Sequence, residues 1–104
     1  MKKRYIVCIN NSNSYWEKKF VNYLKKNSLG WWHWIDGVWL VTDYYGRLSS
    51  EIIRNDLMDI FPNIRIMVIQ LNQNGTDTWH SAGTASPEEN EKMFNWLHEF
   101  WKRY

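Results

Sequence analysis

The chain of 104 residues has only one cysteine, two prolines and five glycines, and its formal net charge is only +2. A lone cysteine, Cys8, excludes an internal disulfide and is typical of a protein from a reducing cytoplasm. No apolar run reaches the length that a membrane span needs. The basic start at residues 1–4 resembles the beginning of a signal peptide, but a short alternating strand follows it instead of a sustained apolar segment. We therefore predict a cytoplasmic protein that does not associate with a membrane.

The charge balance, 13 basic against 11 acidic residues, is weak for a nucleic-acid-binding protein. Most of the basic residues occur as adjacent pairs, such as Lys18-Lys19 and Lys25-Lys26, and solvated helix faces explain most of these pairs. A phosphate-contacting role stays open as an alternative, with Lys18 and Lys25 as its cations. Asn11 and Asn13 lie in a polar loop before a predicted helix, where free backbone N–H groups suit an anion. A capped turn explains the same loop without any ligand.

Aromatic residues are abundant, with eight Trp, six Tyr and four Phe. Each large ring can bury roughly 150–250 Å², so a single domain over residues 1–104 can form a substantial core. Two apolar runs flank Asp36-Gly37 within residues 31–42, which predicts a β-hairpin with a two-residue type I′ turn.

The predicted register makes Ile35 and Val38 direct partners and places Trp32, Trp34 and Trp39 together on one face. The other face then carries Trp31, His33, Ile35, Val38, Leu40 and Thr42. Because neither face is polar, both have to be covered. We expect helices on one face and a second copy of the chain on the other, with the three tryptophans Trp32, Trp34 and Trp39 at the interface between copies.

Hydrophobic periodicity and capping signals predict strands over residues 4–9, 31–35, 38–42 and 64–71, and helices over 15–27, about 50–60 and from 87 onward. Ser14 with Glu17 reads as a capping box for the first helix, and Gly30 suits a left-handed residue after it. Pro62 stops the second helix. Ser86 followed by Pro87 starts the last one.

This order of elements predicts an α+β fold of the ferredoxin-like βαββαβ type. It consists of a four-stranded antiparallel sheet with two helices on one face, to which a C-terminal helix is added. The last helix is expected to cover part of the open face, and a second subunit the rest.

The hairpin pattern Trp31-Trp32-His33, a short gap and Trp39-Leu40-Val41 resembles the SinR-like family of small bacterial proteins, which is similar to the smaller CRISPR adaptation nuclease. Trp79 near Gly83 and Trp96-Leu97 in the closing helix agree with it. The resemblance implies a dimer of ferredoxin-like subunits, associated with nucleic acid, with toxin–antitoxin systems or with phage defence.

In the CRISPR-associated relatives an Asp at the end of the first strand, one from each subunit, holds a divalent metal for phosphodiester cleavage. The matching residue is Asn10. An amide oxygen carries no formal charge, whereas Mg²⁺ prefers carboxylates. We therefore expect no metal site and no cofactor, with Mg²⁺ required only under a nuclease alternative.

His33 and His80 are the remaining catalytic candidates beside Asn10. As an acid–base pair they would suit metal-free RNA cleavage. A core side chain that donates to a backbone carbonyl or an acid is the more common role for a His at the position of His33, and solvation explains His80. Without a neighbouring Cys, Asp or Glu cluster, they make a poor zinc site.

The sequence thus favours a non-catalytic or weakly catalytic homodimeric module for binding or assembly. One alternative is a metal-dependent endonuclease or endoribonuclease. The other is an inhibitor or antitoxin that binds a single protein partner.

Overall fold

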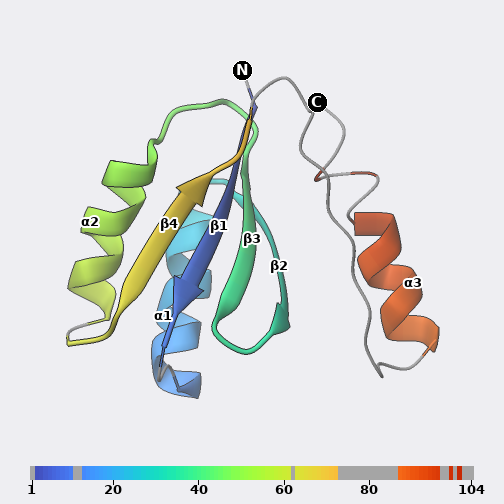
Figure 1. Ribbon diagram of the computed structural model, residues 1–104, viewed down its shortest axis with the longest axis horizontal. Helices are drawn as coiled ribbons and strands as arrows, with labels where there is room; N and C mark the ends of the chain where they lie inside the picture. Colours follow the sequence, from blue (N-terminus) through green and yellow to red (C-terminus); the bar gives the residue numbers. More distant parts are fainter. Residues whose placement is uncertain are drawn as a thin grey trace.

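A computed structural model describes residues 2–10, 13–61, 63–72, 87–96, 99 and 101. Its elements, in chain order, are β1 (Lys3–Ile9), α1 (Ser14–Lys26), β2 (Gly30–Ile35), β3 (Val38–Asp43), α2 (Ser50–Ile60), β4 (Ile66–Gln70) and α3 (Pro87–Trp96). The four strands form one antiparallel sheet in the order β2-β3-β1-β4. Helices α1 and α2 cover one face of it, and α3 stands beside β2 (Figure 1). The predicted α+β fold with a βαββαβ, ferredoxin-like arrangement is confirmed.

Local capping fixes where α1 begins, one residue earlier than predicted. Asn13 is the N-cap, in an extended conformation, and its Oδ1 accepts the N–H of Trp16 at 3.1 Å. Ser14 is therefore the first helical residue and does not cap. After the helix Ser28 takes the left-handed conformation, with φ of 55°, while Gly30 already belongs to β2.

Helix α2 begins and ends as the sequence predicts. The Ser49 hydroxyl accepts the N–H of Ile52 at 3.1 Å, and the helix ends before Pro62. Its inner face buries Ile53 and Leu57, with Phe61 following at the C-cap. Strand β4 is shorter than the predicted 64–71, since pairing with β1 runs from Ile66 to Gln70.

The hairpin differs from its predicted register. Ile35 does pair with Val38, but the pairing shifts by one residue between His33 and Ile35. His33 is then opposite Trp39, and Trp34 lies at the irregularity instead of opposite Trp39. The turn is also not type I′, because Gly37 has a positive φ of 77° and Asp36 does not.

The main core lies between the sheet and the helices α1 and α2. Phe20 of α1 is at its centre, with ring centroids 4.7 Å from Trp39 and 6.0 Å from Phe61. Eleven buried side chains form this core: Tyr5, Val7, Ile9, Phe20, Leu24, Leu29, Trp39, Val41, Ile53, Leu57 and Phe61. Such edge-to-face aromatic contacts add to the burial of apolar area. The aromatic excess of the sequence is thus used largely inside the subunit.

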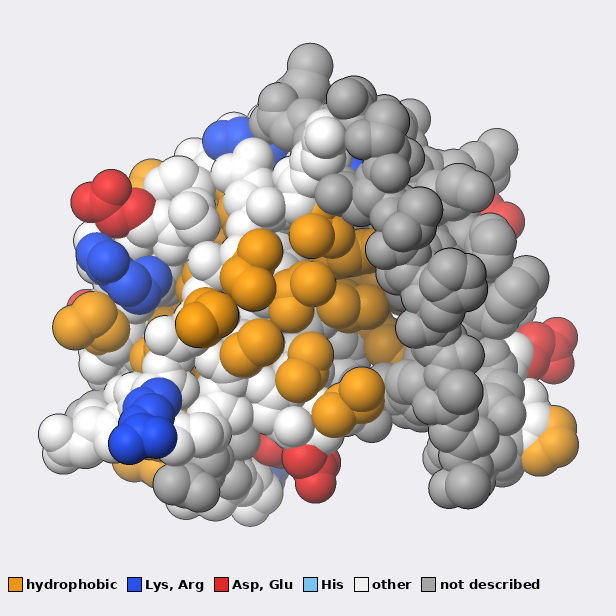
Figure 2. All heavy atoms as spheres, in the orientation of Figure 1, with side chains coloured by type: hydrophobic (Ala, Val, Ile, Leu, Met, Phe, Trp, Pro, Cys, Tyr) orange, Lys and Arg blue, Asp and Glu red, His pale blue; other side chains and the backbone are white. Residues whose placement is uncertain are grey.

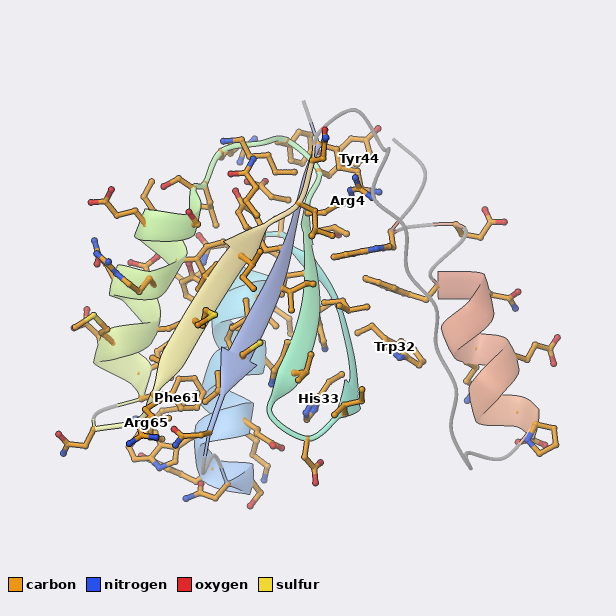
Figure 3. The ribbon with its side chains drawn as sticks, in the orientation of Figure 1. Arg4, Trp32, His33, Tyr44, Phe61 and Arg65 are labelled. Atoms are coloured by element: carbon orange, nitrogen blue, oxygen red, sulfur yellow. The ribbon has the colours of Figure 1, made fainter. Side chains whose placement is uncertain are left out.

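The opposite face of the sheet is covered at one end by residues from the C-terminal part of the chain. Trp101 is 2% exposed and lies 5.9 Å, between ring centroids, from Trp96. Trp96 in turn lies 6.2 Å from Trp32, which points away from the α1–α2 layer (Figure 3). The buried Arg4 guanidinium is 5.7 Å from the Trp101 ring, within cation–π range. This confirms that the C-terminal part covers some of the open face.

Among the described residues, no helix combines the length and the apolar character that crossing a membrane requires.

Candidate functional site

Several of the candidate residues fall outside what the structure describes. Asn11 and His80 lie outside the described residues, as does Ser86, the expected cap of the last helix. The side chain of Trp34 is also not described. The proposed pairing of His33 with His80 therefore stays a prediction.

Asn10 has a structural role at the end of β1. Its side-chain Oδ1 accepts the N–H of Arg65 at 2.7 Å, and its own N–H donates to the carbonyl of Arg65 at 3.2 Å. These bonds extend the β1–β4 pairing by one residue. The donor set does not fit Mg²⁺, since the amide oxygen is neutral and already accepts a backbone N–H. Within the described part of the chain, no group of three His, Cys, Asp or Glu is placed to hold a metal ion.

Asn13, the second asparagine of that loop, also has an assigned role. Its side chain caps α1 and accepts a helix N–H. This is the ligand-free alternative that the sequence left open for the loop, and the structure supports it at this residue.

The face of the sheet opposite α1 and α2 carries two complete apolar rows, one residue per strand. The first row is Ile35, Val38, Cys8 and Met67; the second is Trp32, Leu40, Ile6 and Ile69. No charged side chain interrupts either row. Figure 2 shows apolar side chains gathered over this face of the sheet.

The C-terminal part covers the second row more than the first. Trp32, Leu40 and Ile6 pack in the cluster around Trp101. By contrast Ile35 and Met67 remain 58% and 60% exposed, and Ile69 remains 42% exposed. Val38 and Cys8 are half-buried between them. We call these five residues, Ile35, Val38, Cys8, Met67 and Ile69, the open-face patch.

The predicted interface tryptophans do not share a face. Because of the register shift, Trp39 points into the main core, where it is only 2% exposed and has no surface to offer a partner. Trp32 lies on the other face beneath Trp96. The expected apolar face exists, but the exposed part of it is aliphatic and lies mainly toward β4 and the hairpin turn.

A second surface feature is a groove of about 520 Å³ between α1 and β2, which we call the α1–β2 groove. Its lining includes Lys18, Asn22 and Lys25 from α1 and Trp31, His33 and Trp39 from the hairpin. The structure thus brings together two lysines and a histidine that the sequence singled out separately. The involvement of Trp31 and Trp39 was missed, because the predicted register placed these two residues on opposite faces.

His33 lies flat against Trp39, with ring centroids 3.8 Å apart and an interplanar angle of 6°. The Nε2 of His33 and the Nε1 of Trp39 are both buried and have no hydrogen-bond partner among the described residues. Most buried polar atoms do find a partner, so two such nitrogens beside one groove call for an explanation.

No protein-family model, curated protein or solved structure matches this chain. The resemblance to the SinR-like family stays a prediction.

Proposed function

We propose that this protein is a homodimeric assembly module, in which two copies join through the open-face patch. The observation that carries the proposal is the pair of uninterrupted apolar rows, of which one end is left uncovered within the subunit. Soluble monomeric proteins rarely expose a large contiguous apolar patch to water. Where such a patch occurs, it usually marks a surface that binds another molecule.

A second copy fits this patch better than a partner of different chemistry. A twofold dimer presents the same patch from both sides, so its surface has to be self-complementary. An aliphatic sheet face without charges meets that condition, since it offers no charge for an oppositely charged partner to match. The depletion of charge also agrees with the composition of the buried centre of interfaces.

The energetic balance favours a reversible dimer. Full burial of an Ile or Met side chain stabilises by about 1.5–3 kcal/mol. Ile35, Met67 and Ile69 are about half exposed, so covering them contributes about 1 kcal/mol each, or about 6 kcal/mol for both copies. Association costs about 4–15 kcal/mol before any gain. The contacts at Val38, Cys8 and the rim therefore decide the affinity, and we expect dissociation on dilution.

Sedimentation velocity on a dilution series tests the proposal, with two matched variants. Met67 on the patch is 60% exposed, and Met58 on the outer side of α2 is 59% exposed. Met67→Asp places a carboxylate in each half of the interface and should give a monomer. Met58→Asp makes the same chemical change away from the patch and should dimerise like the wild-type protein.

We expect wild-type dimers at about 100 μM that dissociate toward about 1 μM, as a weak interface implies. A wild-type monomer throughout this range would overturn the homodimer and favour a different protein partner. Equal loss of dimer in both variants would overturn the assignment of the interface to the open-face patch.

A further inference from the structure

We propose that the α1–β2 groove binds a nucleotide, with its base against the aromatic wall and its phosphate between Lys18 and Lys25. This site is separate from the open-face patch, because it lies on the α1 side of the sheet and the patch lies on the opposite side. Either proposal can fail without the other.

The aromatic wall is formed by Trp31 and His33, with the buried Trp39 ring packed against His33 on the same side of the hairpin. Trp31 and His33 alternate along β2, and Trp39 pairs with His33 across the ladder. His33 already forms a parallel stack on Trp39. Trp31 and His33 are both half-buried, so each leaves ring surface at the groove. A planar base extends such a stack, and stacking of this kind is sequence-tolerant because every base has a π-face.

The cationic side comes from one stripe of α1. Lys18, Asn22 and Lys25 follow each other at spacings of four and three residues, so they lie on the same side of the helix. The two lysines are roughly 10 Å apart along the axis. Both are exposed and line the groove, so their ammonium groups reach a phosphate without first being desolvated. Asn22 between them offers an amide as a further donor.

Glu17, which also lines the groove, sets the polarity of the site. Helix α1 runs antiparallel to β2 (Figure 1), so Glu17 and Lys18 lie toward His33, whereas Asn22 and Lys25 lie toward Trp31. A carboxylate repels phosphate and accepts hydrogen bonds from the amino group of a base. The phosphate between the two lysines should therefore lie nearer Lys25 than Lys18, with the exocyclic edge of the base toward Glu17.

The groove also suits a ligand of this size and character. Its volume of about 520 Å³ falls within the roughly 300–1,000 Å³ that is usual for small-molecule sites. His33 and Trp39, each with a buried ring nitrogen that has no hydrogen-bond partner among the described residues, belong to the same wall. A base with ring nitrogens brings hydrogen-bond acceptors to this wall, whereas an aliphatic ligand would bring none.

Isothermal titration calorimetry with adenosine monophosphate, adenosine and a single-stranded oligoadenylate tests the site. The variant Lys18→Gln/Lys25→Gln removes the two groove lysines. Its matched control, Lys19→Gln/Lys26→Gln, removes two lysines of the same helix that do not line the groove. Because both variants lose two positive charges, a general effect of net charge cancels between them.

We expect adenosine monophosphate to bind, the groove variant to weaken it about tenfold, and the control to change it less than about twofold. Binding of the oligoadenylate alone, with the same dependence on Lys18 and Lys25, would support the site and identify a nucleotide within a strand as its ligand. Equal weakening by both variants, equal binding of adenosine, or no binding of any probe at about 1 mM would overturn the proposal.

A second readout places the ligand without relying on affinity. In ¹H–¹⁵N spectra the indole N–H signals of Trp31 and Trp39 should shift on addition of adenosine monophosphate. The signal of Trp101, which is buried on the opposite side of the sheet, should not. Shifts confined to Trp101 and its neighbours would overturn the assignment to this groove.

Discussion

Gly37→Ala adds a single methyl group where the hairpin turn meets the end of β1. Gly37 has a positive φ of 77°, and its carbonyl accepts the N–H of Ile9 at 2.7 Å. A Cβ built on Gly37 would overlap the carbonyl oxygen of Ile9, which is backbone and cannot rotate away. The substitution should therefore disturb the fold although it removes no side chain.

Two costs add at this position. Placing an alanine in the left-handed region costs about 1–2 kcal/mol. Relieving the overlap moves the turn away from β1 and weakens the Ile9–Gly37 hydrogen bond, which contributes about 0.5–1.5 kcal/mol. We expect the free energy of unfolding to fall by about 2–3 kcal/mol, and the melting temperature of a domain of this size by roughly 8–24 °C.

Urea unfolding followed by tryptophan fluorescence measures this loss, at two protein concentrations because the proposed self-association would add to stability. Gly37→Asn separates the two costs, since asparagine tolerates a positive φ but still carries the Cβ. It should remain about 1 kcal/mol less stable than the wild-type protein. A loss below about 0.5 kcal/mol for alanine, or full stability with asparagine, would refute the reasoning from the close approach.

Two further predictions concern pH and the end of β1. Burial, followed by the charge of Arg4, lowers the pKa of Lys2 from 10.5 to about 8, so the cost of the buried charge is present below about pH 8 and is relieved as pH rises toward 10.5. Burial raises the pKa of Tyr5 from 10.0 to about 12, so stability should fall as pH rises from 10 through 12. Urea unfolding between pH 7 and 11 should therefore show a maximum near pH 10, and Lys2→Met should abolish the rise toward it; a rise that persists in this variant contradicts the assignment. Asn10→Ala should cost about 1 kcal/mol by removing the acceptor for the Arg65 N–H, whereas Asn10→Asp should cost less. Hydrogen exchange at the Arg65 amide checks this, and unchanged protection in the alanine variant would count against it.

The elements that the sequence predicted best are those with local signals. The Ser49 cap and the break at Pro62 set the limits of α2. Trp16, Phe20 and Leu24 recur at helical spacing and do face the core. Capping and periodicity act within a few residues, so the sequence alone contains them. The predicted N-cap of α1 was wrong by one residue, because Asn13 and Ser14 are adjacent and both residue types are common N-caps.

The hairpin register could not be read from the sequence. The regular two-residue repeat of a β-strand predicted that Trp39 lies opposite Trp34. In the structure, the register shift between His33 and Ile35 places Trp39 opposite His33. One irregular residue moves every later side chain to the other face. The contact between the rings of Trp39 and Phe20 forms only when the chain folds, so the sequence pattern does not reveal it. This single shift decided which tryptophans are buried beneath α1 and which lie beneath the C-terminal part.

The candidate sites divide in the same way. The sequence identified Lys18, Lys25 and His33 one by one, but only the placement of α1 against β2 brings them to one groove. The chemistry of Asn10 predicts a poor metal ligand, and the structure shows instead that its side chain accepts a backbone N–H. Its actual partner, Arg65, lies 55 residues further along the chain.

By itself, the sequence determined the order of strands and helices, the ferredoxin-like class of fold and the absence of a polar face on the sheet, because alternation and helical spacing are properties of neighbouring residues. The tertiary structure alone decided how much of the second face stays exposed, which rings stack and which charges meet. Those outcomes depend on contacts between residues far apart in the chain, whose energies are settled only when the whole subunit packs.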